Sequence, residues 1–218
     1  DTLIRKTIEE LSNYLSRDIK LKVVLKKQIP LGSGLGGGSA DASAIARAVF
    51  KIFNIHYKKK EVIEILNKVG SDLPACFYSS NVFVEGTGNR LKHLKKIHFN
   101  PWVLIITPSL NVSTKFIFES FKGPFSKKIQ SEFNASNLIE DMNKNKNPLQ
   151  ETVRKEFIKY SKLMDSLPKL NNITVPRMTG SGSSIFLLFD KECDAKEYLF
   201  AIKKLTKNCW KKISQISL

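Results

Sequence analysis

Five of the chain's 11 glycines fall at positions 32, 34, 36, 37 and 38. Glycine permits positive φ angles and a close approach of the backbone to a ligand, so successive N–H groups can point at one anion. A helical pattern follows at once, with apolar residues on one face at Ala42, Ile45, Ala46, Val49 and Phe53. The free N–H groups of a helix N-terminus add to the attraction. The stretch therefore predicts a phosphate-binding loop.

The start of this helix is predicted at Ser39, which would serve as the N-cap. Asp41 would then lie in the first turn, where a carboxylate is favoured by the positive end of the helix dipole.

Two known phosphate motifs do not explain the loop. The Walker motif requires Gly-Lys-Ser/Thr, whereas Gly38 is followed by Ser39 and Ala40. The spacing of Gly32, Gly34 and Gly37 meets G-x-G-x-x-G, but residues 28–30 separate it from the strand expected at 19–26, and no strand follows the helix before residue 58. A glycine-rich turn without a ligand accounts for two or three glycines better than for five.

Residues 30–43, PLGSGLGGGSADAS, resemble the phosphate loop of the GHMP kinases, a family that phosphorylates small molecules with ATP. The resemblance implies an ATP site built from Pro30, Gly32, Gly34, Leu35, Gly36, Gly37, Gly38, Ser39 and Ala40. It also implies Mg²⁺, with Ser39 as the protein contact. Family members often have a second serine where Ala40 stands, which leaves a two-serine metal site in doubt.

The run Gly-Gly-Gly-Ser-Ala-Asp-Ala is similar to one branch of the family in particular. The acceptor of that branch is the cytidine diphosphate derivative of methylerythritol, and its 2-hydroxyl is phosphorylated in non-mevalonate isoprenoid precursor synthesis. Other family members, acting on mevalonate derivatives or homoserine, would share the loops without a cytidine pocket.

Asp72 lies in the segment Gly-Ser-Asp-Leu-Pro-Ala-Cys-Phe at residues 70–77. From the residues alone, Asp72 caps a short helix with Pro74 in its first turn. The segment also resembles the one that carries the proposed catalytic base of the kinases. Capping and catalysis would compete for the same carboxylate.

Two later segments complete the candidate site. Residues 111–118 are similar to the segment that lies against the cytidine and the acceptor alcohol, which implies that Phe118 stacks on the base and that Thr114 lines the pocket. Without the resemblance, Phe118 is equally well explained as a core residue. Residues 178–184, MTGSGSS, resemble the third motif of the family and imply substrate contacts from Thr179 and Gly180; the alternative is a tight turn.

The elements that would position these residues are a mixture of helices and strands. Helices are predicted at 3–15, 39–53, 62–69, 137–142, 149–167 and 195–205, and from Ser113 or Thr114. The run Asn-Pro-Leu-Gln at residues 147–150 predicts a helix start, with Asn147 as the cap and Gln150 at the capping-box position. Strands are predicted at 19–26, 82–85, 90–94, 102–106, 185–189 and 210–216. The resemblance to the GHMP kinases implies that the fold class is α+β. The resemblance implies a ribosomal-protein-S5-like N-terminal domain, incomplete here, over residues 1–99 and a ferredoxin-like C-terminal domain over residues 100–218.

Composition narrows the choice of partners. The net charge of +16 makes a nucleic-acid-binding protein the main alternative, but 30 of the 36 basic residues are lysines scattered beside Glu and Asn, without interleaved aromatic residues. We expect a cytoplasmic kinase of a small molecule, a monomer or homodimer with no nucleic acid or membrane partner. Three cysteines without C-x-x-C spacing are typical of buried thiols in a reducing compartment.

The first residue is Asp1 and not Met. Members of the family carry an N-terminal segment with a lysine and a histidine near the acceptor, and this sequence lacks it. We therefore expect the catalytic set named above to be incomplete.

Overall fold

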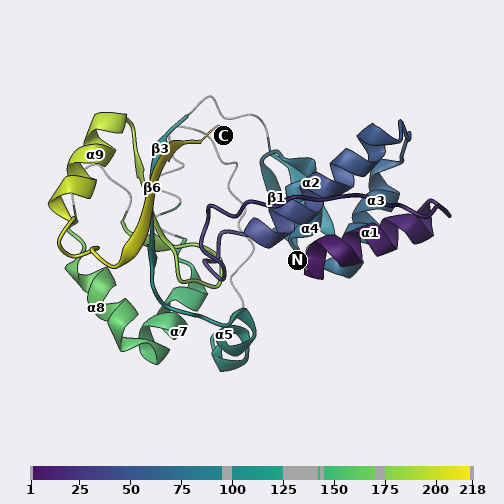
Figure 1. Ribbon diagram of the computed structural model, residues 1–218. Helices are drawn as coiled ribbons and strands as arrows, with labels where there is room; N and C mark the ends of the chain where they lie inside the picture. Colours follow the sequence, from purple (N-terminus) through teal and green to yellow (C-terminus); the bar gives the residue numbers. More distant parts are fainter. Residues whose placement is uncertain (1, 95–99, 125–141, 143–144, 170–174, 217–218) are drawn as a thin grey trace. The chain divides into compact units, whose positions relative to one another are not determined.

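The computed structural model describes residues 2–94, 100–124, 142, 145–169 and 175–216 (Figure 1). The chain divides into two compact units. The first contains residues 1–28 and 36–96, and the second contains residues 29–35 and 97–218. The division passes between Leu35 and Gly36, within the glycine-rich stretch. The mixture of helices and strands confirms the predicted α+β class.

The first unit is built from helices and one hairpin. Its elements are α1 (Thr2–Tyr14), α2 (Gly37–Ile52), α3 (Lys59–Val69), α4 (Leu73–Tyr78), β1 (Val82–Glu85) and β2 (Arg90–His93). The apolar faces of the helices meet in a core that includes Leu11, Val49 and Leu66, all fully buried. The helices predicted at 3–15 and 62–69 and the hairpin across residues 86–89 are confirmed.

The strand predicted at residues 19–26 is wrong. These residues adopt no regular secondary structure, and Val24 is 85% exposed. An alternating pattern shows that a segment suits a half-buried strand, but a strand also needs a neighbour that pairs with its backbone groups. Among the described residues no strand pairs with this segment.

The second unit contains an antiparallel sheet of β4 (Arg177–Met178), β5 (Ile185–Phe189), β3 (Trp102–Pro108) and β6 (Cys209–Gln215), in that spatial order. Leu104 pairs with Leu187 and Ile106 with Ile185. Because side chains alternate across a strand, these four residues point to one face. They pack there with α7 (Pro148–Glu156), α8 (Ile158–Ser166) and α9 (Glu192–Ala201). The predicted strands at 102–106, 185–189 and 210–216 are confirmed within two residues at most ends.

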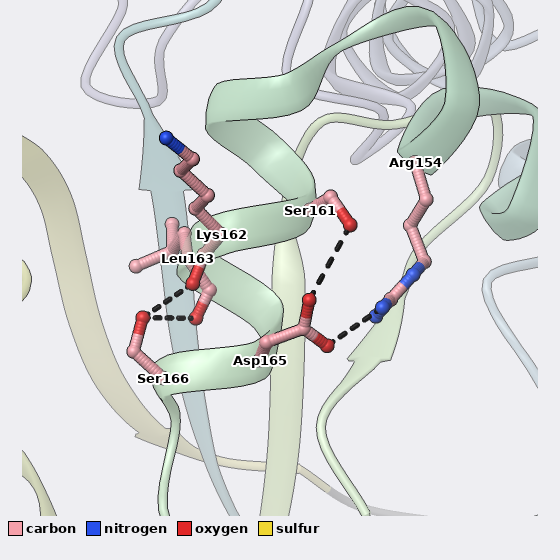
Figure 2. Close-up of polar contacts among 6 residues, drawn as sticks. All are labelled: Arg154, Ser161, Lys162, Leu163, Asp165 and Ser166. Carbon is pink, nitrogen blue, oxygen red and sulfur yellow. Dashed lines mark hydrogen bonds and ion pairs between the residues drawn. The ribbon is translucent and has the colours of Figure 1, made fainter.

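Residues 149–167, predicted as one helix, form two. The helix breaks at Phe157, whose backbone is extended (φ −126°, ψ 90°) and whose ring contacts Phe116. Arg154 on α7 reaches Asp165 on α8, with 2.6 Å between guanidinium nitrogen and carboxylate oxygen (Figure 2). In a straight helix residues eleven apart would be separated by about 16 Å. The break at Phe157 therefore folds α8 back toward α7.

The other helices predicted in this unit agree with the structure to different degrees. Helix α5 (Thr114–Ser120) begins where predicted, with Ser113 as its N-cap. Helix α9 begins three residues before the predicted start and ends at Ala201, before the predicted end. The short helix predicted at 137–142 lies outside the described residues except for Met142. None of the helices in the described ranges is long and apolar enough to cross a membrane.

Candidate nucleotide and acceptor site

The first glycine loop (residues 30–38) alternates between backbone conformations. Gly32, Gly34 and Gly36 have φ angles of 66°, 73° and 65°, in the left-handed region that favours glycine. A chain that visits this region repeatedly turns successive N–H groups toward the same side and can form an anion-binding concavity. The prediction that this stretch needs glycine for its backbone is confirmed at these three positions.

The helix after the loop begins two residues earlier than predicted. Gly36 is the N-cap of α2, and Ala40 N–H makes the first helical bond, to Gly36 O at 2.9 Å. The assignment of Ser39 as N-cap is therefore wrong, and Asp41 lies beyond the first turn. The amides of Gly37, Gly38 and Ser39 are the free donors of this N-terminus.

Space remains open beside Gly36 and Gly37, whereas a Cβ atom at Gly38 would lie 3.3 Å from Leu3 Cδ1. A Cβ atom added at Gly36 or Gly37 would meet no atom within 4 Å among the described residues. Lys27 forms an ion pair with Asp41, both in the first unit. The N-terminus of α2 therefore presents main-chain donors that have no hydrogen-bond partner among the described residues.

Asp72 lies in the same unit, at the N-cap position of α4. Its side chain makes no capping hydrogen bond, although the sequence allowed a capping role, and the residue is exposed. Helix α4 is held against α2 by Ser43 Oγ, which donates to Leu73 O at 2.9 Å, and by Arg47, which donates to Cys76 O at 2.8 Å. The carboxylate therefore stands on a helix anchored to α2 without being used to cap its own helix.

Cys76, one turn after Asp72, shows the effect of this setting. Burial raises the pKa of its thiol, and the nearby Asp72 carboxylate raises it further. The thiol is therefore protonated at neutral pH and is not a nucleophile there.

In the second unit, the first part of the first glycine loop packs against residues 178–184, the second glycine loop. Thr179 Oγ1 donates to Gly34 O at 3.0 Å, and Ser184 N–H donates to Ser33 O at 3.1 Å. A Cβ at Gly34 would lie 2.5 Å from Gly182 O, a distance that real Cβ atoms do not reach. The two loops, far apart in the sequence, are thus in main-chain contact.

Hydroxyl groups fasten the second glycine loop to its surroundings. Ser184 Oγ and Thr107 Oγ1 lie 2.7 Å apart, and Ser183 Oγ donates to Leu110 O at 3.2 Å. Thr114 Oγ1 lies 2.8 Å from Ser181 Oγ and so joins the start of α5 to the loop. These bonds make the loop a fixed part of the second unit.

The candidate substrate residues are accordingly of two kinds. The hydroxyls of Thr114 and Thr179 already bond to protein atoms, and Gly180 supplies an exposed backbone. Phe118 on α5 is 60% exposed, so the alternative of a core phenylalanine is wrong. Its ring is available to stack on a ligand, whereas Phe116 contacts Phe157.

Two residues of this region were interpreted from the sequence only as a helix start. Asn147 Oδ1 accepts from Leu149 N at 3.0 Å, as an N-cap should, but its Nδ2 donates to Met178 O and Gly180 O at 3.2 and 2.7 Å. Gln150, predicted to complete a capping box, instead accepts from Met178 N at 2.8 Å. The residue types at 147–150 identify the helix cap. They do not indicate the contact with a segment about 30 residues further along the chain, because that contact depends on the tertiary fold.

Comparisons with known proteins find similar sequences in one family. Residues 2–80 match the model of the GHMP kinases N terminal domain. The chain is 35% identical over 204 residues to 4-diphosphocytidyl-2-C-methyl-D-erythritol kinase of Wigglesworthia glossinidia brevipalpis, covering 90% of this chain and 62% of the relative. It is 32% identical over 209 residues to the kinase of the same name of Wolbachia pipientis wMel, covering 95% and 72%. The chain thus spans about two thirds of the length of these relatives.

Solved structures show the same fold at lower identity. A crystal structure of 4-(cytidine 5′-diphospho)-2C-methyl-D-erythritol kinase aligns with a TM-score of 0.75 at 21% identity, covering 98% of this chain and 78% of the other. Homoserine kinase from Cytophaga hutchinsonii aligns with a TM-score of 0.75 at 17% identity, covering 100% and 76%. The family match over residues 2–80 and the 32% identity to a relative of which the chain covers 72% show that the chain belongs to the GHMP kinase family.

Proposed function

We propose that this protein transfers a phosphoryl group from ATP to the 2-hydroxyl of 4-diphosphocytidyl-2-C-methyl-D-erythritol, a step in the non-mevalonate synthesis of isoprenoid precursors. The observation that supports this most directly is the set of free amides of Gly37, Gly38 and Ser39 at the N-terminus of α2, beside the open space at Gly36 and Gly37. Such donors suit the oxygens of a triphosphate. The names of the relatives supply the acceptor.

Phosphoryl transfer depends on placing the reactants and on stabilising charge at the phosphates. In the proposed reaction the amides of the first glycine loop hold the phosphate oxygens, and Asp72 orients the acceptor hydroxyl and accepts its proton. Thr114, Phe118, Thr179 and Gly180 would line the acceptor side, with Phe118 stacked on the cytosine ring. Stacking suits Phe118 because its ring is exposed and lies on a helix whose start is fastened to the second glycine loop.

When bound, Mg²⁺ would supply positive charge that neutralises part of the charge on the phosphates. Among the described residues no group of three or more His, Cys, Asp or Glu side chains could hold a metal ion. Mg²⁺ at kinase sites commonly keeps water and phosphate ligands and takes one or two from the protein. The Ser39 hydroxyl, in the first turn of α2, fits such a limited contribution.

We further propose that the kinase acts in the cytoplasm as a monomer or homodimer, without nucleic acid. All three cysteines are unpaired, which suits a reducing compartment. Cys76 and Cys209 are partly buried, whereas Cys193 is exposed, so the expectation of a buried thiol is wrong at Cys193.

The proposal is tested by ADP release from full-length protein given ATP, Mg²⁺ and the cytidine substrate. Asp72→Asn is expected to lower kcat by 10²- to 10⁴-fold, the usual contribution of a positioned acid or base. The matched control is Asp18→Asn, which neutralises an exposed carboxylate in the same unit and should leave kcat within about twofold. A loss of less than about tenfold at Asp72 would mean that the assigned role is wrong.

The acceptor is tested separately by inhibition. CMP should compete with the cytidine substrate, and mevalonate or homoserine should neither compete nor be phosphorylated. Turnover of mevalonate or homoserine, with no effect of CMP, would move the protein to another branch of the family.

A further inference from the structure

We propose that Asn147 and Gln150, in the first turn of α7, act as positioning residues for nucleotide binding. Their side-chain amides hold the second glycine loop, and this loop holds the first. The proposal rests on the proposed function, because it assigns these two residues to the affinity of the ATP site. Neither residue touches the nucleotide in this proposal.

Asn147 uses all of its polar side-chain atoms in two tasks. Its oxygen accepts from Leu149 N and caps α7, while its nitrogen donates to Met178 O and Gly180 O. A carbonyl oxygen cannot donate, so the nitrogen must face the loop and the oxygen must face the helix. A helix cap needs only the oxygen, as Ser113 shows by capping α5 with a hydroxyl.

Gln150 also binds the second glycine loop, at the main chain of Met178. Its oxygen accepts from Met178 N, while Asn147 binds Met178 O, so the first turn of α7 binds both main-chain polar groups of Met178. Met178 is buried at 1% exposure, where a main-chain group without a partner is costly. The position of the second glycine loop is therefore set by where α7 begins.

A displacement of the second loop would be transmitted to the first. Gly34 is in contact with Thr179 and Gly182 with no room for a Cβ, and Ser33 O accepts from Ser184 N. These are main-chain contacts, which cannot be relieved by rotating a side chain. Because Ser33 and Gly34 belong to the loop that is proposed to bind ATP, a displacement of the second glycine loop would change the backbone of that part of the loop. Misplacements of about 1 Å are enough to impair a positioned site.

The chemistry of the two amides allows a matched pair of variants. Asn147→Asp keeps the cap oxygen, since aspartate caps helices as well as asparagine, but it replaces the donor to the loop with an acceptor. Gln150→Glu keeps the acceptor that Met178 N requires. Both changes replace an amide with a carboxylate of the same size and add one negative charge. Only the first removes a hydrogen-bond donor that the loop uses.

We expect Asn147→Asp to raise the KM for ATP, and the Kd of a non-hydrolysable ATP analogue measured by titration calorimetry, at least tenfold, with kcat changed less than threefold. Gln150→Glu should stay within threefold for all three quantities. Gln150→Met, which loses the acceptor, should raise KM and Kd like Asn147→Asp. Arg154→Ala, which breaks the ion pair between α7 and α8 without touching the loop, should leave KM unchanged (Figure 2).

Equal effects of Asn147→Asp and Gln150→Glu would overturn the proposal, because added charge would then explain both. Unchanged nucleotide affinity in Asn147→Asp would overturn it as well. If the wild-type protein binds no ATP analogue, the proposed function fails. The hold of Asn147 on the second glycine loop is then tested by amide hydrogen exchange at Ser184, whose N–H donates to Ser33 O. Hydrogen exchange at Ser184 should be faster in Asn147→Asp than in the wild type and unchanged in Gln150→Glu. Equal exchange rates in the two variants would show that Asn147 does not hold the loop in place.

Discussion

Gly34 is the residue at which the two glycine loops meet, and its missing side chain is what allows them to meet. Its φ angle of 73° alone would disfavour other residues. The space around it is more restrictive, since a Cβ would lie within 2.8 Å of Gly182 C and Thr179 O, which are main-chain atoms. Gly37 is different: its φ is not positive, and a Cβ there would meet nothing within 4 Å. The same residue type thus serves two purposes within four positions.

This difference predicts opposite results for two substitutions by alanine. Gly34→Ala should destabilise the second unit by at least about 2 kcal/mol, because strain in the backbone and a main-chain clash add together. Gly37→Ala should change stability by less than about 0.5 kcal/mol, because alanine suits a helix. Urea unfolding followed by tryptophan fluorescence measures the effect of Gly34→Ala, because Trp102 and Trp210 both lie in the second unit. Far-UV circular dichroism, which also reports the helices of the first unit, measures the effect of Gly37→Ala.

Ligand binding separates the two variants further. Gly37→Ala should still lower the affinity for an ATP analogue at least tenfold, because its Cβ would fill the open space beside the free amides of α2. A Gly37→Ala variant with wild-type affinity would contradict phosphate binding at this N-terminus. A Gly34→Ala variant with wild-type stability would contradict the loop contact.

The sequence could identify which glycines matter but not why each one does. The unusual number of glycines before a helix marked the loop, and Asp72 was marked by resemblance. The cap of α2 was misassigned to Ser39, because serine is a common N-cap and Gly36 caps without any side chain. The loop contacts of Asn147 could not be predicted at all, since they depend on where residues 178–184 fold.

At the scale of elements, two buried tyrosines in the core of the second unit differ in their hydrogen bonding. Tyr160 on α8 and Tyr198 on α9 are both 1% exposed and belong to the same core. Tyr198 OH donates to Pro168 O at 2.8 Å, whereas Tyr160 OH has no hydrogen-bond partner among the described residues. Burial raises the pKa of Tyr198 to about 12 and that of Tyr160 still further above its ordinary value. Both phenols therefore remain neutral over the working pH range.

Tyr160→Phe is expected to be neutral or to stabilise the protein by up to about 1 kcal/mol, because it removes a buried hydroxyl that has lost its water without gaining a partner. Tyr198→Phe should destabilise by about 1 kcal/mol, because it leaves Pro168 O without its donor. The midpoint of urea unfolding, at constant slope, gives both values. A destabilisation by Tyr160→Phe equal to that of Tyr198→Phe would show that Tyr160 OH has a partner after all.

Most helices and strands were predictable from the sequence. The wrong predictions at 19–26 and 149–167 share one cause. The strands at 102–106 and 185–189 are continuous apolar runs, and Ser113 and Asn147 begin their helices as local rules require. The segment 19–26 has an equally plausible pattern but no pairing neighbour among the described strands. The helix at 149–167 has an unbroken apolar face, yet packing around Phe157 divides it. Pattern predicts which face is buried, and tertiary contacts decide whether the element forms without interruption.

For the whole molecule, the net charge of +16 needs an explanation that fits a small-molecule kinase. Many basic side chains lie on helix surfaces beside acidic ones, as in the i,i+4 pairs of Lys115 with Glu119 and Lys196 with Glu192. Such exposed pairs contribute little to stability. The excess of lysine can still attract any polyanion without specificity. Charge alone therefore does not distinguish a nucleic-acid-binding protein from a basic enzyme.

The salt dependence of ligand binding distinguishes a nucleic-acid-binding protein from a basic small-molecule kinase. Binding of a labelled RNA should have a Kd weaker than about 1 µM at physiological salt, should match the binding of heparin, and should weaken steeply as salt rises, because it depends on released counterions. In the proposed site an ATP analogue binds main-chain amides that packing holds in place, so it should keep stabilising the protein at 0.3 M salt. At 100 times its Kd the analogue should add about 2.7 kcal/mol to the free energy of unfolding. RNA binding below 1 µM at 0.3 M salt, combined with no stabilisation by the ATP analogue, would replace the kinase with a nucleic-acid-binding protein.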